Sequence, residues 1–451
     1  MNWTLARASQ ALGETLTSHD VALNSIVTDT RRLSPGALFV ALEGERFDGH
    51  EFLAQAREAG AAAAVVSRKV DDPLPQLLCS DTRLALGLLA REQRRAWGKK
   101  LVAITGNSGK TTVKEILAHL LGGRQQVLAT EGNLNNDIGA PLTLLRLSDE
   151  HRAAVVELGA NHLGEIAWTT ALALPQVAVI TNVTGAHVGE FGGMGRIAQA
   201  KAEILGGLAA DGLAVLNSDD AYFTTWKSLA APRKVCSFGL NNDAMVTANA
   251  LSCDASGRYA FTLVAEGVEL GRVTLPLLGR HNVSNALAAA AAALALGLDG
   301  KRLVERLGSV TTLPGRLCVV SGVRGTRLLD DTYNANPGAM HAALETLAEL
   351  PGPHWCALGA MGELGEASAS LHAEVGRRAR ELDIERLFTI GEAARPAAQA
   401  FGPAAQHFDD HAALVRHLIN SLPSGASVLV KGSRSAGMEA VVSALRTDEP
   451  R

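Results

Sequence analysis

The segment that most restricts the fold is residues 101–121, where an apolar run (LVAIT) leads into a short loop and then a helical pattern (TTVKEILAHLL). The loop residues are Gly106, Asn107, Ser108, Gly109, Lys110, Thr111 and Thr112. A loop between a strand and a helix points backbone N–H groups at an anion. Lys110 can reach the β- and γ-phosphate oxygens of a nucleoside triphosphate, and a threonine hydroxyl can bind Mg²⁺. The full motif needs glycine at position 104, where Ile104 stands, so a shorter P-loop is predicted.

Further strand-like and helix-like segments alternate on both sides of this loop. Apolar runs recur at 153–158, 177–183 and 213–217, which predicts a mainly parallel sheet covered by helices. Residues 258–277 instead alternate between polar and apolar side chains, which predicts an antiparallel appendage. An alanine-rich helix is expected over 282–297, because alanine is the best helix former.

At 451 residues the chain is too long for a single core. We predict three α/β domains, with a small N-terminal domain at 1–84, a central P-loop domain at 85–312 and a third α/β domain at 313–451. A linker near residues 311–315 and renewed alternation of strand and helix patterns after it support the last boundary.

Composition excludes several functions. The net charge of −4 and the scattered basic residues do not favour nucleic acid binding. The first residues lack the apolar core of a signal peptide, and no run approaches about 18 apolar residues, so we expect a cytoplasmic protein without membrane insertion.

The cysteines are odd in number and have no C-x-x-C spacing, so they are expected to be reduced and mostly buried. They are Cys79, Cys236, Cys253, Cys318 and Cys356.

Two polar residues follow strand-like runs and are candidates for a ligand site. Glu157 ends one run and His187 follows another, and open α/β sheets bind ligands at the carboxyl edge of their strands. A carboxylate and an imidazole there could hold Mg²⁺, although a lone histidine is more often structural. Lys201, in a helical segment, is expected from composition to be a solvated surface lysine.

Seven segments occur together in the order typical of one family. They are TGNSGKTT, the run ending at Glu157, AHVGEFGG, GRHNVSNALAAAA, LPGR, LDDTYNANP and VLVKGSRS. Over nearly its whole length the chain resembles the Mur ligases. The segments VTDTRRLSPGALFVALEGERFDGHEF and GNLNNDIGAPLTLL are most similar to the members that add D-alanyl-D-alanine.

The resemblance implies an ATP-dependent, ADP-forming amide ligase of peptidoglycan precursor synthesis. The γ-phosphoryl group of ATP would pass to the free carboxylate of UDP-N-acetylmuramoyl-tripeptide, and the amine of D-Ala-D-Ala would attack the acyl phosphate. It also implies ATP and Mg²⁺ as cofactors and a monomer. The N-terminal domain would hold the UDP end of the substrate, and a Rossmann-like C-terminal domain would close over the central ATPase domain.

The resemblance also assigns residues to roles. Lys110 and Thr111 would bind the phosphates. The metal would be bound by Thr111, Glu157, His187 and Lys201. Lys201 would be carbamoylated by CO₂, which makes its side chain resemble a carboxylate. Asn282 would contact the adenine, and Arg316 and Asp331 would reach ATP from the linker and third domain. The UDP-linked substrate would meet Asp29, Thr30, Arg31, Asp48, Gly49, His50, Asn133, Asn135 and Asn136. The dipeptide would meet Tyr333, Asn334 and Asn336, with Lys431 as a charge contact in the closed form.

Three alternatives stay open. A diaminopimelate- or lysine-adding Mur ligase shares the ATPase domain, but a motif for a diamino acid is not recognisable here. A folylpolyglutamate synthetase is disfavoured by the N-terminal UDP-type motif. A nonenzymatic P-loop switch would not require Glu157, His187 and Asp331 together.

Overall fold

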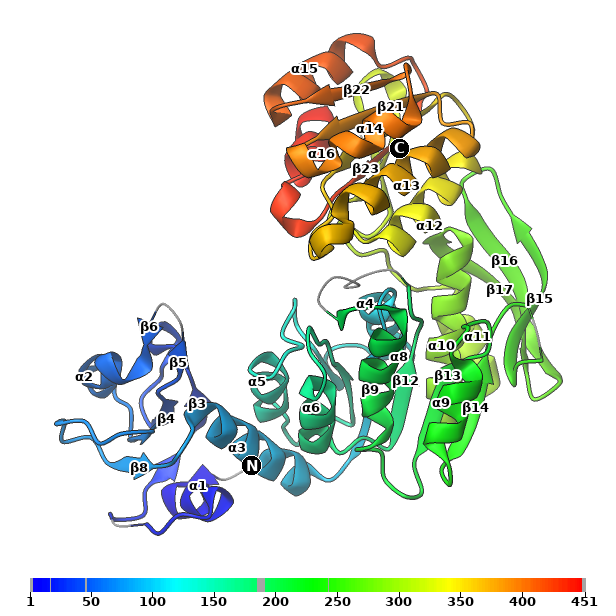
Figure 1. The fold of residues 1–451 in the computed structure, drawn as a ribbon. Helices are drawn as coiled ribbons and strands as arrows, with labels where there is room; N and C mark the ends of the chain where they lie inside the picture. The colour runs from blue at the N-terminus through cyan, green and yellow to red at the C-terminus, as the bar shows by residue number, and fades with distance from the viewer. Residues whose placement is uncertain (1–2, 17, 45–46, 185–190, 242, 448–451) are drawn as a thin grey trace.

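The computed structural model describes residues 3–16, 18–44, 47–184, 191–241 and 243–447. Three α/β domains follow one another along the chain, as predicted, and the central domain lies between the other two (Figure 1). The predicted boundary at residue 84 falls inside helix α3 (Thr82–Trp97), and residue 312 lies in the segment between the central and C-terminal sheets.

The N-terminal domain is built on a four-stranded parallel sheet of order β3-β4-β7-β8. Its strands are Ser25–Val27, Ala37–Val40, Ala63–Val66 and Gln76–Leu78. Two small strand pairs are also present: β1 (Trp3–Thr4) pairs with β2 (Ala22–Leu23), and β5 (Glu43–Gly44) pairs with β6 (Phe47–Asp48). The helices are α1 (Leu5–Leu12) and α2 (Leu53–Glu58). The two central strands are buried throughout, because each is an uninterrupted apolar run.

The central domain carries a nine-stranded sheet of order β10-β11-β9-β12-β13-β14-β15-β16-β17. These strands are Val127–Ala129, Ala153–Glu157, Lys100–Thr105, Val177–Ile180, Leu213–Asn217, Lys234–Phe238, Val246–Cys253, Arg258–Ala265 and Val268–Leu278. Strand β16 pairs antiparallel with both β15 and β17, which confirms the predicted appendage. Because β9 lies between β11 and β12, the P-loop at its end is flanked by the ends of both neighbours.

Helices cover both faces of this sheet, with a separate apolar core on each face. They are α4 (Lys110–Leu120), α5 (Gly139–Leu145), α6 (Glu165–Ala173), α8 (Met194–Ala202), α9 (Phe223–Ala230), α10 (Arg280–Ala295) and α11 (Gly300–Leu307). The alanine-rich helix α10 packs against α4 and against β12 to β15, and its alanines from 286 to 293 are fully buried. Methyl side chains permit this close approach of helix to sheet.

The C-terminal domain has a six-stranded sheet of order β18-β19-β23-β20-β21-β22, in which only β18 is antiparallel. The strands are Cys318–Ser321, Arg327–Asp331, Ser427–Lys431, His354–Gly359, Arg386–Ile390 and Ala405–Phe408, and the helices are α12 (Pro337–Ala348), α13 (Ser368–Glu381), α14 (Arg395–Phe401), α15 (His411–Ser421) and α16 (Glu439–Leu445). Apolar cores lie on both faces, as the Rossmann-like expectation requires.

The five cysteines are all free, but the expectation that most are buried is wrong. Cys356 is buried, Cys253 is exposed, and the other three are partly exposed. Cys253 ends a strand of the appendage, where one face of the ribbon meets solvent. Across the described ranges, every helix is too short or too polar to span a bilayer.

The packing of α10 can be tested with one substitution at two positions. Ala289 is fully buried in the core, whereas Ala295, the last residue of the same helix, is exposed. We expect Ala289→Leu to lower the free energy of unfolding by about 1–3 kcal/mol, because added methylenes overfill a packed core. Ala295→Leu, the matched control, should change it by less than about 0.5 kcal/mol. Calorimetric unfolding of both variants measures this, and equal stabilities would show that α10 is loosely packed.

Candidate active site

The P-loop joins β9 to α4 at the carboxyl edge of the central sheet. Gly109 has φ +81°, and a Cβ built on it would lie 2.2 Å from Oδ1 of Asn285 in α10. Gly106 has φ +141°, and its Cβ would lie 1.9 Å from Thr181 Oγ1. Both positions therefore require glycine for backbone conformation and for space.

The end of β12 holds this loop in shape. Asn107 N donates to Asn182 O (2.9 Å), Ser108 N donates to Asn182 Oδ1 (3.0 Å), and Thr181 Oγ1 donates to Ser108 O (2.7 Å). Neither Thr181 nor Asn182 was among the predicted site residues. Their position at the end of the apolar run VAVI, next to the P-loop strand, is a signal that could have found them.

Lys110 opens α4, and its ammonium remains within the loop. Nζ donates to Gly106 O (2.8 Å) and Asn107 O (3.2 Å). Burial lowers the pKa of Lys110, and the nearby carboxylate of Glu157 opposes this shift. The ammonium is thus held beside the backbone N–H groups that would meet phosphate oxygens.

Glu157, at the end of β11, is only 3% exposed. Its Oε2 accepts from Thr111 Oγ1 (2.9 Å), its Oε1 accepts from Asn135 Nδ2 (2.9 Å), and its backbone N donates to Thr130 Oγ1 (2.9 Å). A carboxylate and a hydroxyl beside a P-loop are the hard oxygen donors that suit Mg²⁺. Within the described residues, no group of three or more His, Cys, Asp or Glu side chains could hold a metal ion.

Lys114 helps to position Glu157 through Thr130, and it was not among the predicted site residues. It lies one turn after Lys110 and is 1% exposed, although a lysine at such a helical position would ordinarily be expected at the surface. Its Nζ donates to Thr130 O (2.6 Å) and pairs with Glu115 (2.7 Å). Thr130 therefore links the P-loop helix to the backbone of Glu157.

Lys201 is 2% exposed, so the composition-based expectation of a surface lysine is wrong. It lies on the inner face of α8, with Nζ 5.6 Å from the centroid of the Phe191 ring. Burial lowers the pKa of Lys201 to about 7, and the charge of Lys110 contributes to this shift. His187, predicted to lie nearby, is outside the described residues.

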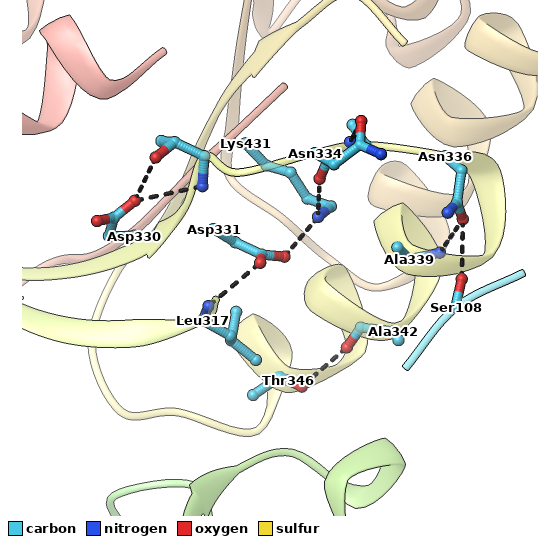
Figure 2. A network of polar contacts seen from close by, with 12 residues as sticks. Ser108, Leu317, Asp330, Asp331, Asn334, Asn336, Ala339, Ala342, Thr346 and Lys431 are labelled. Atoms are coloured by element: carbon cyan, nitrogen blue, oxygen red, sulfur yellow. Dashed lines mark hydrogen bonds and ion pairs between the residues drawn. The ribbon is translucent and has the colours of Figure 1, made fainter. Parts of the chain in front are cut away.

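The C-terminal domain contributes an ion pair opposite the P-loop. Asp331 ends β19 and Lys431 ends β23, and the two residues are in register on neighbouring strands. Asp331 Oδ2 accepts from Lys431 Nζ (2.5 Å), and Asp331 Oδ1 accepts from Leu317 N (3.1 Å), as Figure 2 shows. Lys431 Nζ also donates to Asn334 O (2.9 Å), so its ammonium is engaged within its own domain.

Hydrogen bonds join the P-loop region to the linker and the C-terminal domain. Ser108 Oγ donates to Asn336 Oδ1 (3.2 Å), the same atom that caps α12 by accepting from Ala339 N (2.9 Å) (Figure 2). Arg316 Nη2 donates to Thr111 Oγ1 (2.9 Å), and the Arg316 guanidinium carbon lies 4.0 Å from the centroid of the Tyr333 ring.

A cavity of about 900 Å³ lies between these elements. It brings together most of the predicted site residues, which are Asn107, Ser108, Gly109, Lys110, Thr111, Thr112, Asn133, Asn135, Asn136, Glu157, Lys201, Asn282, Arg316, Asp331, Tyr333, Asn334, Asn336 and Lys431. It also includes residues that were not predicted, among them Asn161, Glu165, Thr184, His281, Asn285, Glu363 and Arg434. The volume suits a nucleotide together with the reacting ends of further substrates.

The predicted substrate residues of the N-terminal domain do not line this cavity. His50 is 3% exposed and has both ring nitrogens engaged, since Nε2 accepts from Ser67 N (2.9 Å) and Nδ1 donates to Asp48 Oδ1 (2.6 Å). The hydrogen bond from Arg68 holds the pKa of Asp48 well below its usual value. A Cβ on Gly49 would lie 2.7 Å from the backbone of Leu42. These three residues thus stabilise a turn.

The remaining predicted residues of this domain are more accessible. Asp29 caps the short 3₁₀ helix Thr30–Arg32 by accepting from Arg31 N (3.0 Å), and it pairs with the Arg31 guanidinium (2.8 Å). Thr30 Oγ1 donates to Gln55 Oε1 (3.2 Å). The side chain of Arg31 is 85% exposed, so a ligand can reach it.

Family models match three consecutive parts of the chain. The Mur ligase family catalytic domain matches residues 23–94, the Mur ligase middle domain matches 104–293, and the Mur ligase glutamate ligase domain matches 315–434. The chain belongs to the Mur ligase family.

Individual Mur ligases are similar over nearly the full length. The UDP-N-acetylmuramoyl-tripeptide–D-alanyl-D-alanine ligase of Escherichia coli is 44% identical over 446 residues, with 98% of each chain covered. A crystal structure of MurF from Acinetobacter baumannii has a TM-score of 0.92 at 37% identity and covers 98% of each chain. A MurF ligase from Thermotoga maritima in complex with ADP has a TM-score of 0.85 at 31% identity, covering 93% of this chain and 96% of that one.

The requirement for glycine at position 109 of this Mur ligase is testable. Gly109 and Gly123 have nearly equal φ values, +81° and +80°, but a Cβ on Gly123 would meet no atom within 4 Å. Alanine at either position has the same left-handed strain of about 1–2 kcal/mol. Only Gly109→Ala should also displace the loop, weakening ADP binding about tenfold or more, which corresponds to about 1.4 kcal/mol. Calorimetric titration with ADP decides this, and equal affinities in both variants would contradict it.

Proposed function

We propose that this chain is the ATP-dependent ligase that joins D-alanyl-D-alanine to UDP-N-acetylmuramoyl-tripeptide in peptidoglycan precursor synthesis. The observation that carries the proposal is the cavity in which the P-loop, Glu157 and Lys201 meet the Asp331–Lys431 pair of the C-terminal domain. The full-length similarity to an E. coli ligase of that name supports the choice of substrates.

We assign the P-loop side of the cavity to ATP. Lys110 would exchange its bonds to loop carbonyls for bonds to the β- and γ-phosphates, while Thr111 and Thr112 stay at the start of α4. Asn282, 5% exposed, would contact the adenine. Arg316 and Asp331 would reach the nucleotide from the linker and the C-terminal domain.

The donors around Glu157 fit Mg²⁺. Mg²⁺ keeps several waters and binds to one or two protein carboxylates plus substrate phosphates, so Glu157, Thr111 and a carbamoylated Lys201 form a sufficient set. When bound, it would neutralise the charge of the triphosphate and of the developing acyl phosphate. The buried amine of Lys201 can add CO₂, because burial keeps much of it uncharged near neutral pH.

The residues of the chain would act on the reaction mainly by position and charge. The γ-phosphoryl group passes to the substrate carboxylate, and attack by the dipeptide amine on the acyl phosphate then forms the amide and releases phosphate. A protein nucleophile is not required in this sequence. Contacts from Asn336 and Arg316 to the P-loop would keep the C-terminal domain over the acyl phosphate and exclude water.

We assign the other substrate ends to the N-terminal domain and to α12. Asp29, Thr30 and Arg31 are the accessible candidates for the UDP end, and Asn133 and Asn136 would line the path of the peptide. Tyr333, Asn334 and Asn336 lie at the wall nearest α12, where the dipeptide would enter. We expect the enzyme to act as a monomer in the cytoplasm, where ATP and the nucleotide-linked precursor occur.

Substrate omission tests the proposal directly. Phosphate release from Mg-ATP should require both UDP-N-acetylmuramoyl-tripeptide and D-Ala-D-Ala, and mass spectrometry should detect the pentapeptide product. The reason is that the phosphoryl group needs the carboxylate and the acyl phosphate needs the amine. Release that depends on a diamino acid instead would indicate a sister ligase, and release without any acceptor would indicate a P-loop switch.

Carbamoylation of Lys201 can be observed separately from activity. At pH 8, above the pKa of about 7, most of the Lys201 amine is uncharged and can react with CO₂. We expect ¹³C-bicarbonate to produce a carbamate resonance in the NMR spectrum that Lys201→Arg removes. Lys114→Arg is the matched control, since Lys114 is equally buried but its ammonium is bonded to Thr130 and Glu115. A resonance that survives in Lys201→Arg would place the carbamate elsewhere.

A further inference from the structure

Arg434 lies on the cavity wall and is not one of the residues assigned to ATP, Mg²⁺ or the substrates. It begins the 3₁₀ helix Arg434–Ala436, directly after β23, and its side chain is exposed where it lines the cavity. Its guanidinium carbon lies 5.8 Å from the centroid of the Tyr333 ring. Tyr333 therefore contacts both Arg434 and Arg316, which extends towards the P-loop.

The other cations of the cavity wall already have partners or a role. Lys431 is 2% exposed and is bonded to Asp331 and to a backbone carbonyl. Lys110 donates to two carbonyls of the phosphate-binding loop. Arg316 donates to Thr111 Oγ1, beside the triphosphate position, and Lys201 is buried beside Phe191.

Arg434 differs from all of these. Within the residues that the structure describes, no carboxylate lies within 4 Å of its guanidinium, and none of the described atoms accepts a hydrogen bond from it. A guanidinium presents its N–H donors in a planar fork that matches the two oxygens of a carboxylate. Arg434 is therefore suited to an anion that enters the cavity from solution.

The cavity that Arg434 lines also has a wall that fits a small ligand with methyl groups. Helix α12 contributes Gly338, Ala339, Ala342 and Ala343 to the cavity wall, so this part of the wall is formed by side chains no larger than a methyl group. A dipeptide of two alanines has one methyl group on each residue. Its amine is consumed in the ligation, whereas its C-terminal carboxylate keeps its charge and needs a cation.

We propose that Arg434 is a specificity-determining residue that binds the C-terminal carboxylate of the incoming dipeptide, in a pocket shared with Tyr333 and the alanines of α12. This inference rests on the proposed function. It assigns the carboxylate to a residue other than Lys431, which the Asp331 pair engages. It predicts that a dipeptide with a neutral or blocked C-terminus is a poor substrate.

The test compares D-Ala-D-Ala with its C-terminal amide as acceptor, in the wild type and in Arg434→Gln. The wild type should prefer the acid by about 10- to 100-fold in kcat/KM, the range of charge-assisted hydrogen bonds. Arg434→Gln should lose that preference because the rate with the acid falls, while the rate with the amide and the KM for ATP stay close to wild type. Arg434→Lys should recover part of the preference, since it keeps the charge but not the fork.

Arg377→Gln is the matched control, because Arg377 is an exposed arginine of α13 in the same domain and does not line the cavity. It should keep the full preference for the acid. The inference is overturned if Arg434→Gln keeps the preference, if it slows both acceptors equally, or if its main effect is on the KM for ATP. A wild type that ligates neither acceptor would instead overturn the proposed function.

Discussion

The position of β9 between β11 and β12 is the constraint on which the site depends. Parallel strands end at a common edge, so one pairing order places the P-loop beside Glu157 on one side and beside Thr181 and Asn182 on the other. The loop is then held by Asn182, and Thr111 is held by Glu157. A shift of one residue in the pairing of β9 with β11 would separate the carboxylate from the loop, and the same shift in the pairing of β9 with β12 would separate Asn182 from it.

Three lysines in and around this site are buried, and the cost of burying their ammonium groups is offset in different ways. Lys114 and Lys431 each have a carbonyl and a carboxylate within hydrogen-bonding distance of Nζ. Lys201 has an aromatic ring beside it instead, and burial lowers its pKa to about 7. An unpaired buried ammonium is costly, so the site favours the uncharged amine of Lys201. This contrast agrees with the proposal that Lys201, rather than Lys114 or Lys431, is carbamoylated.

Sequence reasoning predicted the fold class, the appendage and the P-loop, because these depend on local periodicity and on glycine spacing. It could not predict the burial of Lys114 and Lys201, since a lysine in an amphipathic helix pattern is expected to face solvent. That burial depends on which helix face meets which strand end. It also could not show that Asp48 and His50 are bonded to each other while Arg31 is exposed, because side-chain partners and exposure follow from the folded structure. Arg434 lies in the segment VLVKGSRS, but the resemblance assigned a role there to Lys431 alone.

The two outer domains are joined to the central domain in different ways. Helix α3 belongs to both the N-terminal core, through Leu86 and Leu89, and the central core, through Ala90 and Trp97. Arg94, 3% exposed, donates to Ala173 O (2.7 Å) and Leu174 O (3.1 Å) at the end of α6. A continuous helix with a buried cation fixes the distance between the N-terminal domain and the P-loop.

The hydrogen bonds from the linker and the C-terminal domain to the P-loop region differ from those of Arg94 because they lie at the cavity. Those of Asn336 and Arg316 are made by side chains that line the cavity itself. Substrates that fill the cavity compete with these bonds or add to them, whereas they leave the bonds of Arg94 untouched. The C-terminal domain is therefore held at the P-loop by contacts that a ligand in the cavity can change, whereas the N-terminal domain is held by the continuous helix α3.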